Sequence, residues 1–342
     1  MKIAVVNSGS SSLKFKLFDM LDESVLFEMH IEELRSHHEA LKEILEKLEE
    51  SKIELKMIDA IGHRVVHGGE LFKEAILIDD VVLKSIDKLS ELAPLHNPAN
   101  LEGILAFKNK APTLKQYAIF DTAFHSTMPR EAYLYALPLD MYENHGIRRY
   151  GFHGTSHTYI AKESARILEK ELAELNIISL HLGNGASVCA IKNGKSIDTS
   201  MGFTPLEGLV MGTRSGDMDA AIMPYMMHTL KKSADEVSEI LNKKSGLFGI
   251  CGLSDVREIL SSDDENAKLA LSMMIRRIRK YVGSYMTLFD TLDAVVFTGG
   301  IGEHSSYIKD EVMRGLNIAK TLVIQTDEEL EIARQVKSRY FK

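Results

Sequence analysis

The sequence lacks most of the features that mark secreted and membrane-spanning proteins. It contains two cysteines in 342 residues, Cys189 and Cys251, which is too few for a disulfide framework and is typical of a reducing compartment. No apolar run approaches the length needed to span a bilayer. Residues 1–20 follow a strand-turn-strand pattern with three lysines spread through it, unlike a secretory signal. We therefore expect a cytoplasmic protein.

Excess positive charge is also absent. The chain has 41 Lys and Arg against 49 Asp and Glu, a net charge of −8, so we expect neither nucleic acid nor an anionic membrane as a partner. The negative net charge does not argue against a bound nucleotide such as ATP, because phosphate sites are local. The hydrophobic content of 45% and charged content of 26% are typical of a soluble globular protein. The length favours two domains, and no low-complexity linker interrupts the chain.

The most informative stretch is residues 177–202. The apolar run Ile177–Leu180 predicts a buried strand, and two further strands flank Asn193-Gly194. Asn-Gly between β-rich segments predicts a hairpin because both central positions of the turn need positive φ. In the preceding turn, the small residues from Gly183 to Ser187 would let backbone N–H groups approach an anion such as phosphate. An ordinary glycine-rich hairpin fits this stretch equally well.

The start of the chain repeats this order of elements. Residues 3–17 also run strand, small-polar turn, strand, and an offset of 174 places Gly9 on Gly183 and Ser12 on Ala186. Two such loops, one opening each half, favour the phosphate interpretation. They indicate a duplicated fold with a nucleotide between the halves.

Periodicity and turn signals predict the remaining elements. We expect strands at 3–18 (two), 58–67, 117–120, 293–297 and 322–324, and helices at 31–50, 79–92, from 99, 158–175, 264–290 and from 327. Ser233 and Glu236 form a capping box that begins another helix. Asp121 directly follows a predicted buried strand, which is where α/β folds place chemistry.

Several of these loops together resemble the acetate kinases, a family within the superfamily of sugar kinases and actin-like ATPases. The stretches that carry the resemblance are Asn7–Lys14, Gly62–Gly69, Ala93–Asn100, Phe120–Pro129, Arg148–His157, His181–Ser187, Asp198–Asp219 and Phe297–Glu303. They span nearly the whole chain. The resemblance implies an α/β protein of two duplicated ribonuclease-H-like domains, the actin-like ATPase fold, with the nucleotide in the cleft between them.

The resemblance also implies a domain organisation. We expect an N-terminal ribonuclease-H-like domain at 1–121, with a C-terminal helix at about 326–342 packing back on it. Residues 122–325 would form a second ribonuclease-H-like domain that binds the nucleotide and dimerises. The chain would therefore be a homodimer.

The implied reaction is the reversible, magnesium-dependent transfer of the ATP γ-phosphoryl group to acetate, giving acetyl phosphate and ADP by direct in-line transfer. Such transfer needs positioning and charge neutralisation, and a carboxylate acceptor calls for arginine. Arg64 and Arg214 suit these roles because Gly, His, Thr and Ser flank them rather than helical ion-pair partners. The alternatives are a propionate kinase and a catalytically silent actin-like nucleotide-binding module.

By resemblance, Arg64 would hold the acceptor carboxylate, Arg214 the phosphoryl group in flight, and His153 would add a donor to that group. Taken alone, His153 is better explained as a structural core histidine, but its place in the motif Arg148–His157 favours a role in the site. Asp121 needs no role as a base, because a carboxylate acceptor is already ionised near neutral pH. We expect Asp121 to orient Arg214 or to hold magnesium through water.

The resemblance assigns the remaining acceptor and metal positions. The acceptor's apolar pocket would consist of Val66, Leu95, Phe152 and Pro205. Core packing is the alternative for Val66 and Leu95. Magnesium, or manganese in its place, would be associated with Asn7 and Glu328, whose oxygen atoms suit a hard cation.

For the nucleotide, the resemblance implies three groups of residues besides Lys14, which would reach a phosphate. The phosphates would lie on His181, Leu182, Gly183, Asn184 and Gly185. The adenosine side would contact Asp255, Val256 and Arg257. The base and ribose would meet a turn of Gly300, Ile301, Gly302, Glu303 and His304.

The chain also departs from the family pattern. It is shorter than expected between Asp19 and Gly62 and between Glu303 and Thr326. His304 stands where asparagine is usual, and Gln325 begins a stretch that the family starts with proline. These differences bear on nucleotide preference and magnesium affinity more than on the reaction.

Overall fold

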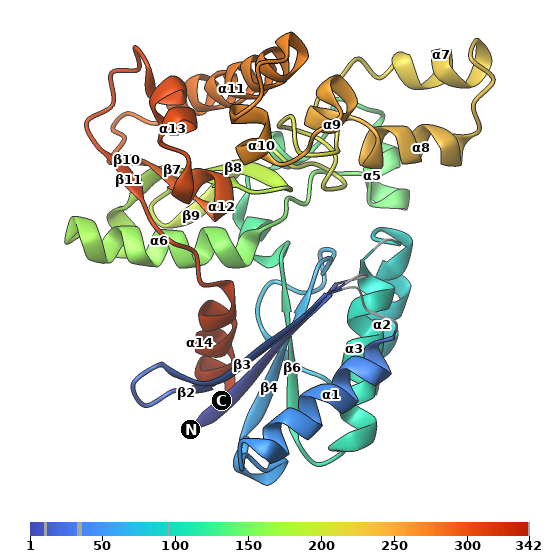
Figure 1. Ribbon diagram of the computed structural model, residues 1–342, viewed down its shortest axis with the longest axis vertical. Coiled ribbons are helices and arrows are strands. Elements are labelled where there is room, and N and C mark those ends of the chain that lie inside the picture. The colour runs from blue at the N-terminus through green and yellow to red at the C-terminus, as the bar shows by residue number, and fades with distance from the viewer. Residues whose placement is uncertain (10–11, 33–35, 95, 341–342) are drawn as a thin grey trace. The chain divides into compact units, whose positions relative to one another are not determined.

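The computed structural model describes residues 1–9, 12–32, 36–94 and 96–340 (Figure 1). The chain divides into two compact units. Unit 1 comprises Met1–Ser126, Phe152–Tyr159 and Asp327–Lys342, and unit 2 comprises Thr127–Gly151 and Ile160–Thr326. Each unit is built around one sheet.

The sheet of unit 1 has the strand order β3-β2-β1-β4-β6-β5. Its strands are β1 (Lys2–Ser8), β2 (Ser12–Asp19), β3 (Ser24–Glu32), β4 (Ala60–Val65), β5 (Ile76–Leu77) and β6 (Lys115–Phe120). The first three pair antiparallel, while β4 runs parallel to β1 and β6 runs parallel to β4. The carboxyl ends of β1, β4 and β6 therefore meet at one edge of the sheet.

The sheet of unit 2 repeats this arrangement with the order β11-β10-β7-β8-β9. Its strands are β7 (Asn176–Leu182), β8 (Ala186–Lys192), β9 (Lys195–Thr199), β10 (Ala294–Thr298) and β11 (Thr321–Val323). Again three antiparallel strands precede two parallel ones. Strands β1 and β7 end 174 residues apart, at Ser8 and Leu182, so the duplication predicted from the offset is confirmed.

The hairpin between β8 and β9 has the predicted turn. Asn193 has φ of 55° and Gly194 has φ of 71°, both in the left-handed region. Asparagine and glycine tolerate this region best, which explains why this dipeptide stands here.

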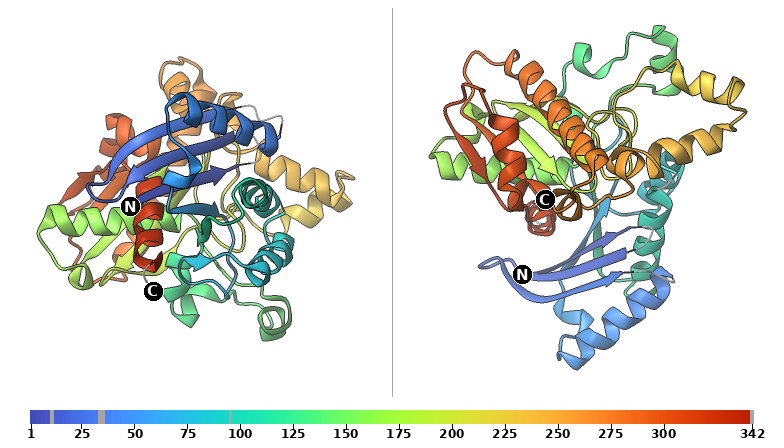
Figure 2. Two further views of the ribbon diagram at one scale, coloured as in Figure 1. Left: turned by 90° about the horizontal axis from the view of Figure 1, so that it is seen from below. Right: turned by 45° about the horizontal axis from the view of Figure 1, so that its top comes forward.

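Helices cover both faces of the unit 1 sheet because β1 alternates its side chains between them. The helices of unit 1 include α1 (His37–Glu50), α2 (Asp80–Lys88), α3 (Asn97–Lys110) and α14 (Glu328–Tyr340). Ala4 and Val6 belong to the core cluster with α1 and α3, whereas Ile3 and Val5 belong to the cluster with α14. Helix α14, the last of the chain, therefore packs against the same strands with which the chain begins (Figures 1 and 2).

In unit 2, helices α6 (Gly154–Leu168) and α11 (Glu265–Met286) lie on opposite faces of the sheet (Figure 1). Helix α6 begins in unit 1 and continues into unit 2. The remaining helices are α4 (Arg130–Tyr133), α5 (Leu139–His145), α7 (Ile222–His228), α8 (Ala234–Lys243), α9 (Gly246–Cys251), α10 (Val256–Leu260), α12 (Gly299–His304) and α13 (Ser306–Met313). The predicted capping box begins α8. Among the described helices, none combines the length and the apolar character required to cross a lipid bilayer.

Three predicted elements were wrong in part. Residues 31–32 end β3, and α1 begins at His37 rather than at 31, because β3 is an edge strand whose residues are exposed or half-buried and give a weak apolar pattern. Helix α6 ends at Leu168, and residues 172–174 form a separate 3-10 turn. The stretch from Gly299 to His304, predicted as a turn, is helix α12.

The packing of α14 on the sheet yields a stability prediction. A Cβ atom at Gly62 in β4 would lie 2.6 Å from Ile332 Cγ2 and 2.8 Å from Val336 Cγ2. Gly62→Ala should therefore lower the free energy of unfolding by about 1–3 kcal/mol through overpacking, measured by denaturant unfolding. Gly283→Ala in α11 is the control, since its methyl group meets nothing within 4 Å and alanine favours a helix. Equal destabilisation of both variants would contradict this packing.

A buried histidine in the same strand predicts sensitivity to acid. His63 is 2% exposed, its Nε2 lies 2.7 Å from Gln116 Oε1, and burial lowers its pKa from 6.5 to about 4. On acidification the unfolded chain therefore takes up this proton before the folded chain does. Above the unfolded pKa of about 6.5 this histidine does not reduce the free energy of unfolding. As the pH falls from 6.5 toward 4, the free energy of unfolding decreases by about 3 kcal/mol for one such histidine.

His63→Gln should therefore make the free energy of unfolding less dependent on pH between neutrality and the folded pKa of about 4. Denaturant unfolding at a series of pH values measures this slope. His38→Gln, which replaces an exposed histidine of α1, is the matched control and should leave the slope unchanged. Identical slopes for wild type and His63→Gln would show that His63 does not cause the pH dependence of the free energy of unfolding.

Candidate active site

The candidate site of unit 1 is centred on an ion pair between two adjacent strand ends. Arg64 lies near the end of β4 and Asp121 directly follows β6, two parallel neighbours in the sheet. Nε of Arg64 donates to Oδ1 of Asp121 at 2.9 Å, and Nη2 donates to Oδ2 at 2.7 Å. This bidentate geometry fixes the plane of the guanidinium group. The Asp121 side chain is 2% exposed and that of Arg64 is 20% exposed.

A second carboxylate approaches the same arginine. Oε2 of Glu328, at the start of α14, lies 3.8 Å from Nη2 of Arg64. Burial alone would lower the pKa of Arg64, but the carboxylates of Asp121 and Glu328 outweigh burial and raise it above its ordinary value. Burial raises the pKa of Glu328 to about 7, an effect that Arg64 opposes and Asp121 reinforces. Within the described part of the chain, Oε2 of Glu328 is buried and has no hydrogen-bond partner.

The first strand supplies two further predicted residues. Oδ1 of Asn7 accepts a long hydrogen bond of 3.5 Å from Nη1 of Arg64. Lys14 on β2 stands opposite Asn7 in the strand register and is exposed. Lys16 forms ion pairs of 3.8 Å with Asp327 and with Glu329 in the first turn of α14. These ion pairs connect the start of α14 to β2. Asn7, Lys14, Arg64 and Asp121 therefore lie together in unit 1.

The segment that carries His153 packs directly on Asp121. The N–H of Gly154 donates to the carbonyl oxygen of Asp121 at 2.9 Å, and a Cβ atom at Gly154 would collide with that oxygen. Thr155 Oγ1 lies 3.5 Å from Asp121 Oδ1. His153 has φ of 58°, a left-handed conformation that costs energy for a non-glycine residue and is frequent at functional sites.

Two asparagines that the sequence analysis missed support the loop after β4. Asn100 accepts from the N–H of Val66 at 3.0 Å and donates to the carbonyl of Ser8. Asn97 accepts from the N–H of His67 and donates to the carbonyl of the same residue, both at 3.0 Å. These amides are buried in the first turns of α3, and the sequence analysis gave neither of them a role although both lie in the stretch Ala93–Asn100. They fix the backbone on which Val66 stands.

The predicted apolar pocket is only partly described. Val66 is half-buried and Phe152 is 1% exposed, and both belong to unit 1. Pro205 belongs to unit 2. Leu95 lies outside the described residues. Whether these four side chains surround an acceptor stays a prediction.

In unit 2, the glycine-rich turn after β7 lies beside a large cavity. His181 and Leu182 end β7 and are buried, and the N–H of Gly183 bonds to the carbonyl of Gly185 at 3.2 Å. The cavity has a volume of about 800 Å³. Its predicted lining residues are Gly183, Asn184, Asp255, Val256, Arg257, Gly300, Ile301 and His304. This volume suits a ligand of nucleotide size.

The structure does not place every predicted nucleotide residue on this cavity. His181, Leu182, Gly185, Gly302 and Glu303 are not among its lining residues. The carboxylate of Glu303 instead accepts from the N–H groups of Gly299 at 2.9 Å and Thr326 at 3.0 Å, so it holds the chain around α12. The lining residues that the sequence analysis missed are Ser254, Leu260, Ser305, Ser306 and Tyr307.

Short helices shape the wall of the cavity. Asp255 caps α10 by accepting from the N–H of Arg257 at 2.8 Å and also pairs with the Arg257 side chain. The hydrogen bonds from Arg257 lower the pKa of Asp255. Nδ1 of His304 lies 2.9 Å from the carbonyl oxygen of Gly300, one turn earlier in α12.

Arg214 is held differently from Arg64. Its Nη1 donates to the carbonyl oxygen of Pro205 at 3.2 Å and approaches Met211 Sδ at 3.9 Å. Burial lowers the pKa of Arg214, and the described residues offer it no carboxylate. The loop that carries it contacts the glycine-rich turn, because the N–H of Gly212 bonds to the carbonyl of Asn184 at 3.1 Å. A partly buried cation, to which the described part of the chain offers no anionic partner, therefore lies on a loop that touches the cavity wall.

Comparisons with known proteins identify the family of the chain. A model of the acetokinase family matches residues 28–341. The acetate kinase of Sulfurimonas denitrificans is 48% identical over 385 residues, which cover 99% of each chain. Because that alignment is longer than the 342 residues of this chain, the relative contains segments that this chain lacks. This agrees with the shortening expected from the sequence.

Solved structures give the same result. The acetate kinase of Porphyromonas gingivalis is 39% identical with a TM-score of 0.91, covering 98% of this chain and 99% of that one. A propionate kinase from Francisella tularensis is 41% identical with a TM-score of 0.92 and covers 98% of both chains. The fold is therefore that of two duplicated α/β domains, as the strand orders of the two sheets show independently. The chain belongs to the acetokinase family.

Proposed function

We propose that this protein is an acetate kinase, which transfers the γ-phosphoryl group of ATP reversibly to acetate and gives acetyl phosphate and ADP. Family membership supports the class of reaction. The observation that carries the proposal is Arg214, a partly buried guanidinium group that is held by neutral acceptors and stands on a loop that contacts the glycine-rich turn. Its full positive charge is available to a phosphoryl group, whose transfer depends on charge stabilisation.

The residues of unit 1 supply the acceptor part of the reaction. Asp121 accepts from Nε and one hydrogen of Nη2 of Arg64, which leaves the other hydrogen of Nη2 and those of Nη1 to donate to an acceptor carboxylate. His153 contributes a donor from a strained backbone position.

Asp121 serves as an orienting group in this proposal. Both of its oxygens accept hydrogen bonds from Arg64, so the carboxylate fixes the orientation of that arginine. An acetate acceptor is ionised and needs no base. The further expectation that Asp121 orients Arg214 stays a prediction.

Magnesium is the metal that fits these residues. Oε2 of Glu328 is a buried oxygen without a hydrogen-bond partner among the described residues, and Oδ1 of Asn7 makes only one long bond. The described residues contain no group of three His, Cys, Asp or Glu side chains suited to a metal, so nucleotide phosphates and water would complete the shell. Asn7 and Glu328 would hold the ion. When bound, it supplies positive charge that neutralises the phosphates.

Two alternative functions are distinguished from acetate kinase by the experiment below. A propionate kinase has the same chemistry with a deeper pocket, and the Francisella tularensis neighbour carries that name. A catalytically silent nucleotide-binding module would keep the fold without the reaction. Neither is favoured by a specific contact of the described residues.

A hydroxamate assay for acyl phosphate tests the proposal. Wild type should form acetyl phosphate from ATP and acetate. Arg214→Ala should lower kcat by on the order of a hundredfold or more with little change in KM, because its charge acts on the transferring group.

Arg64→Ala should raise the KM for acetate, because removing a charge-assisted contact costs about 2–5 kcal/mol of binding free energy.

The double variant Arg64→Ala/Asp121→Asn is the control for stability. Arg64→Ala leaves the buried Asp121 carboxylate without its partner, whereas the double variant removes both charges. A raised acetate KM in both variants, with unchanged ATP binding by calorimetry, supports the assignment. An unchanged acetate KM would contradict it. Propionate turned over faster than acetate would identify the alternative kinase, and no acyl phosphate from either acid would identify the silent module.

The proposal includes a homodimer formed through unit 2. Helix α7 has no buried residue, and with α8 it extends away from the sheet of unit 2 (Figures 1 and 2). Its apolar side chains are exposed: Tyr225 by 58%, Ile222 by 43%, Met223 by 40% and Met227 by 39%. A helix this short gains its stability from packing, so we assign this face to a second copy of the chain.

Tyr225→Glu combined with Met223→Glu should convert the dimer to a monomer, because two charges would be buried without partners at the interface. Multi-angle light scattering measures the molar mass in solution. Leu71→Glu, at an exposed leucine of unit 1, is the control and should remain dimeric. A monomeric wild type would contradict the proposal.

A further inference from the structure

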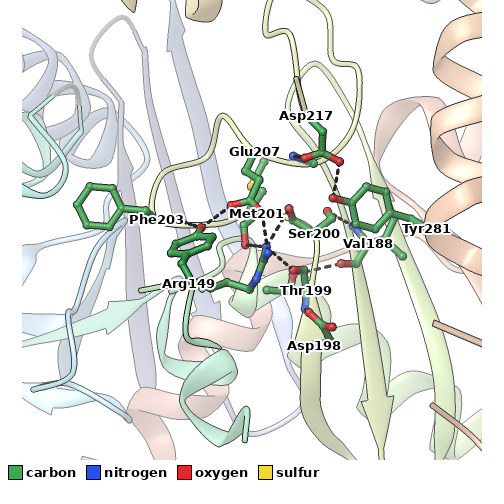
Figure 3. Close-up of polar contacts among 12 residues, drawn as sticks. Arg149, Val188, Asp198, Thr199, Ser200, Met201, Phe203, Glu207, Asp217 and Tyr281 are labelled. Carbon is green, nitrogen blue, oxygen red and sulfur yellow. Dashed lines mark hydrogen bonds and ion pairs between the residues drawn. The ribbon is translucent and has the colours of Figure 1, made fainter. Parts of the chain in front are cut away.

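Arg149 organises the first part of the loop that carries Arg214, and the functions above assign it no role. Its side chain is 17% exposed, and Nη2 forms an ion pair of 2.6 Å with Oε1 of Glu207. Nη1 donates to three successive backbone carbonyls, those of Thr199 at 2.9 Å, Ser200 at 3.3 Å and Met201 at 3.1 Å. Figure 3 shows the guanidinium group at the centre of these contacts.

The ion pair continues into a second set of contacts. The other carboxylate oxygen of Glu207 accepts the hydroxyl group of Tyr135, whose oxygen accepts from the N–H of Phe203 at 2.9 Å. Burial and the charge of Glu207 raise the pKa of Tyr135, so the phenol keeps its proton. Gly202 has no space for a Cβ atom against Glu207 and Tyr135. Residues 199–207 are thus folded around one ion pair.

The second part of the loop is closed at its base by Asp217. Oδ1 of Asp217 accepts from the N–H of Gly208 at 2.7 Å, and the N–H of Asp217 donates to the carbonyl of Gly208 at 3.0 Å. Oδ2 accepts the hydroxyl of Tyr281 at 2.7 Å (Figure 3). Arg277, one turn earlier on α11, donates to the carbonyls of Gly208 at 2.8 Å and Asp217 at 3.0 Å. Both ends of residues 208–217 are therefore tied to a 22-residue helix.

Arg214 depends on both parts of this loop. Its backbone lies in the second part, and its guanidinium group bonds to the carbonyl of Pro205 in the first. Arginine has a long side chain with many rotamers, and a carboxylate partner is the usual means of fixing it. Within the described residues Arg214 has none, so its position is set by the backbone around it.

We propose that Arg149 and the Asp217–Tyr281 pair are positioning residues that place Arg214 for phosphoryl transfer. The inference rests on the role of Arg214 in the proposed function. These groups hold the cation through its backbone and thereby leave its charge unneutralised. A displacement of about 1 Å at a group that acts on the transition state costs on the order of a hundredfold in rate.

Tyr281→Phe is the sharpest test because it removes one hydroxyl group. It should lower kcat for acetyl phosphate formation by on the order of tenfold, while the KM values for acetate and ATP stay nearly unchanged. Tyr285→Phe is the matched control. It lies one turn later on the same helix, and its hydroxyl approaches Asp198 at 3.4 Å rather than the base of the loop. It should keep the wild-type kcat.

A binding measurement separates positioning from a general effect on stability. ADP with aluminium fluoride imitates the transferring phosphoryl group, so its affinity should fall in Tyr281→Phe and Arg214→Ala while the affinity for ADP alone stays unchanged. Arg149→Lys keeps the charge but lacks the planar fork, and it should behave like Tyr281→Phe. Lower melting temperatures with unchanged kcat and unchanged affinity for the mimic would overturn the proposal.

The outcomes for the two proposals are distinguishable. Wild-type activity in Arg214→Ala would contradict the role of Arg214 itself. An inactive Arg214→Ala with Tyr281→Phe and Arg149→Lys both equal to Tyr285→Phe would overturn the positioning inference alone.

Discussion

The charged groups at the carboxyl ends of β4 and β6 must be compensated where they lie, because the hydrogen bonds of the sheet fix these strand ends beside each other. Arg64 and Asp121 satisfy this constraint with a two-point ion pair. Removing one partner of such a buried pair typically costs about 3–5 kcal/mol, since the other charge is left uncompensated. The rest of the unit 1 site is built on this pair. Asn7 and Glu328 approach the arginine, and the backbone of Gly154 approaches the aspartate.

The two arginines of the proposed reaction show opposite solutions to the burial of a cation. Two carboxylates surround Arg64 and raise its pKa, so it is held rigidly but much of its charge is neutralised. Arg214 has no such partner among the described residues, and burial lowers its pKa. A carboxylate beside Arg214 would fix it more simply but would compete with a phosphoryl group. The network of Arg149 and Asp217 fixes the backbone instead, and this arrangement is consistent with a demand for free positive charge at Arg214.

The sequence was sufficient for the features that depend on local or repeated patterns. The strands of the duplication, the Asn193-Gly194 turn and the capping box at Ser233 follow from apolar periodicity and turn chemistry. Strand β3 was missed because an exposed edge strand carries little apolar signal. The pairing of Arg64 with Asp121 requires the register of two strands that are 57 residues apart, which no local pattern contains. The amides of Asn97 and Asn100, and the carboxylate of Asp217, act on distant backbone groups and were missed for the same reason.

The duplicated topology puts the same sheet edge to different uses in the two units. In unit 1 the parallel strands β4 and β6 end in charged side chains, and an ion pair fills the edge. In unit 2, strand β10, which takes the place of β4 in the strand order, ends at Thr298 and is followed by Gly299 and Gly300 of α12, of which Gly300 lines the cavity. Gly299 has φ of 77° and no space for a Cβ atom against Leu182, so the turn itself requires glycine. The backbone thus provides the same edge twice, and the residues just after each strand decide whether it carries charge or admits a ligand.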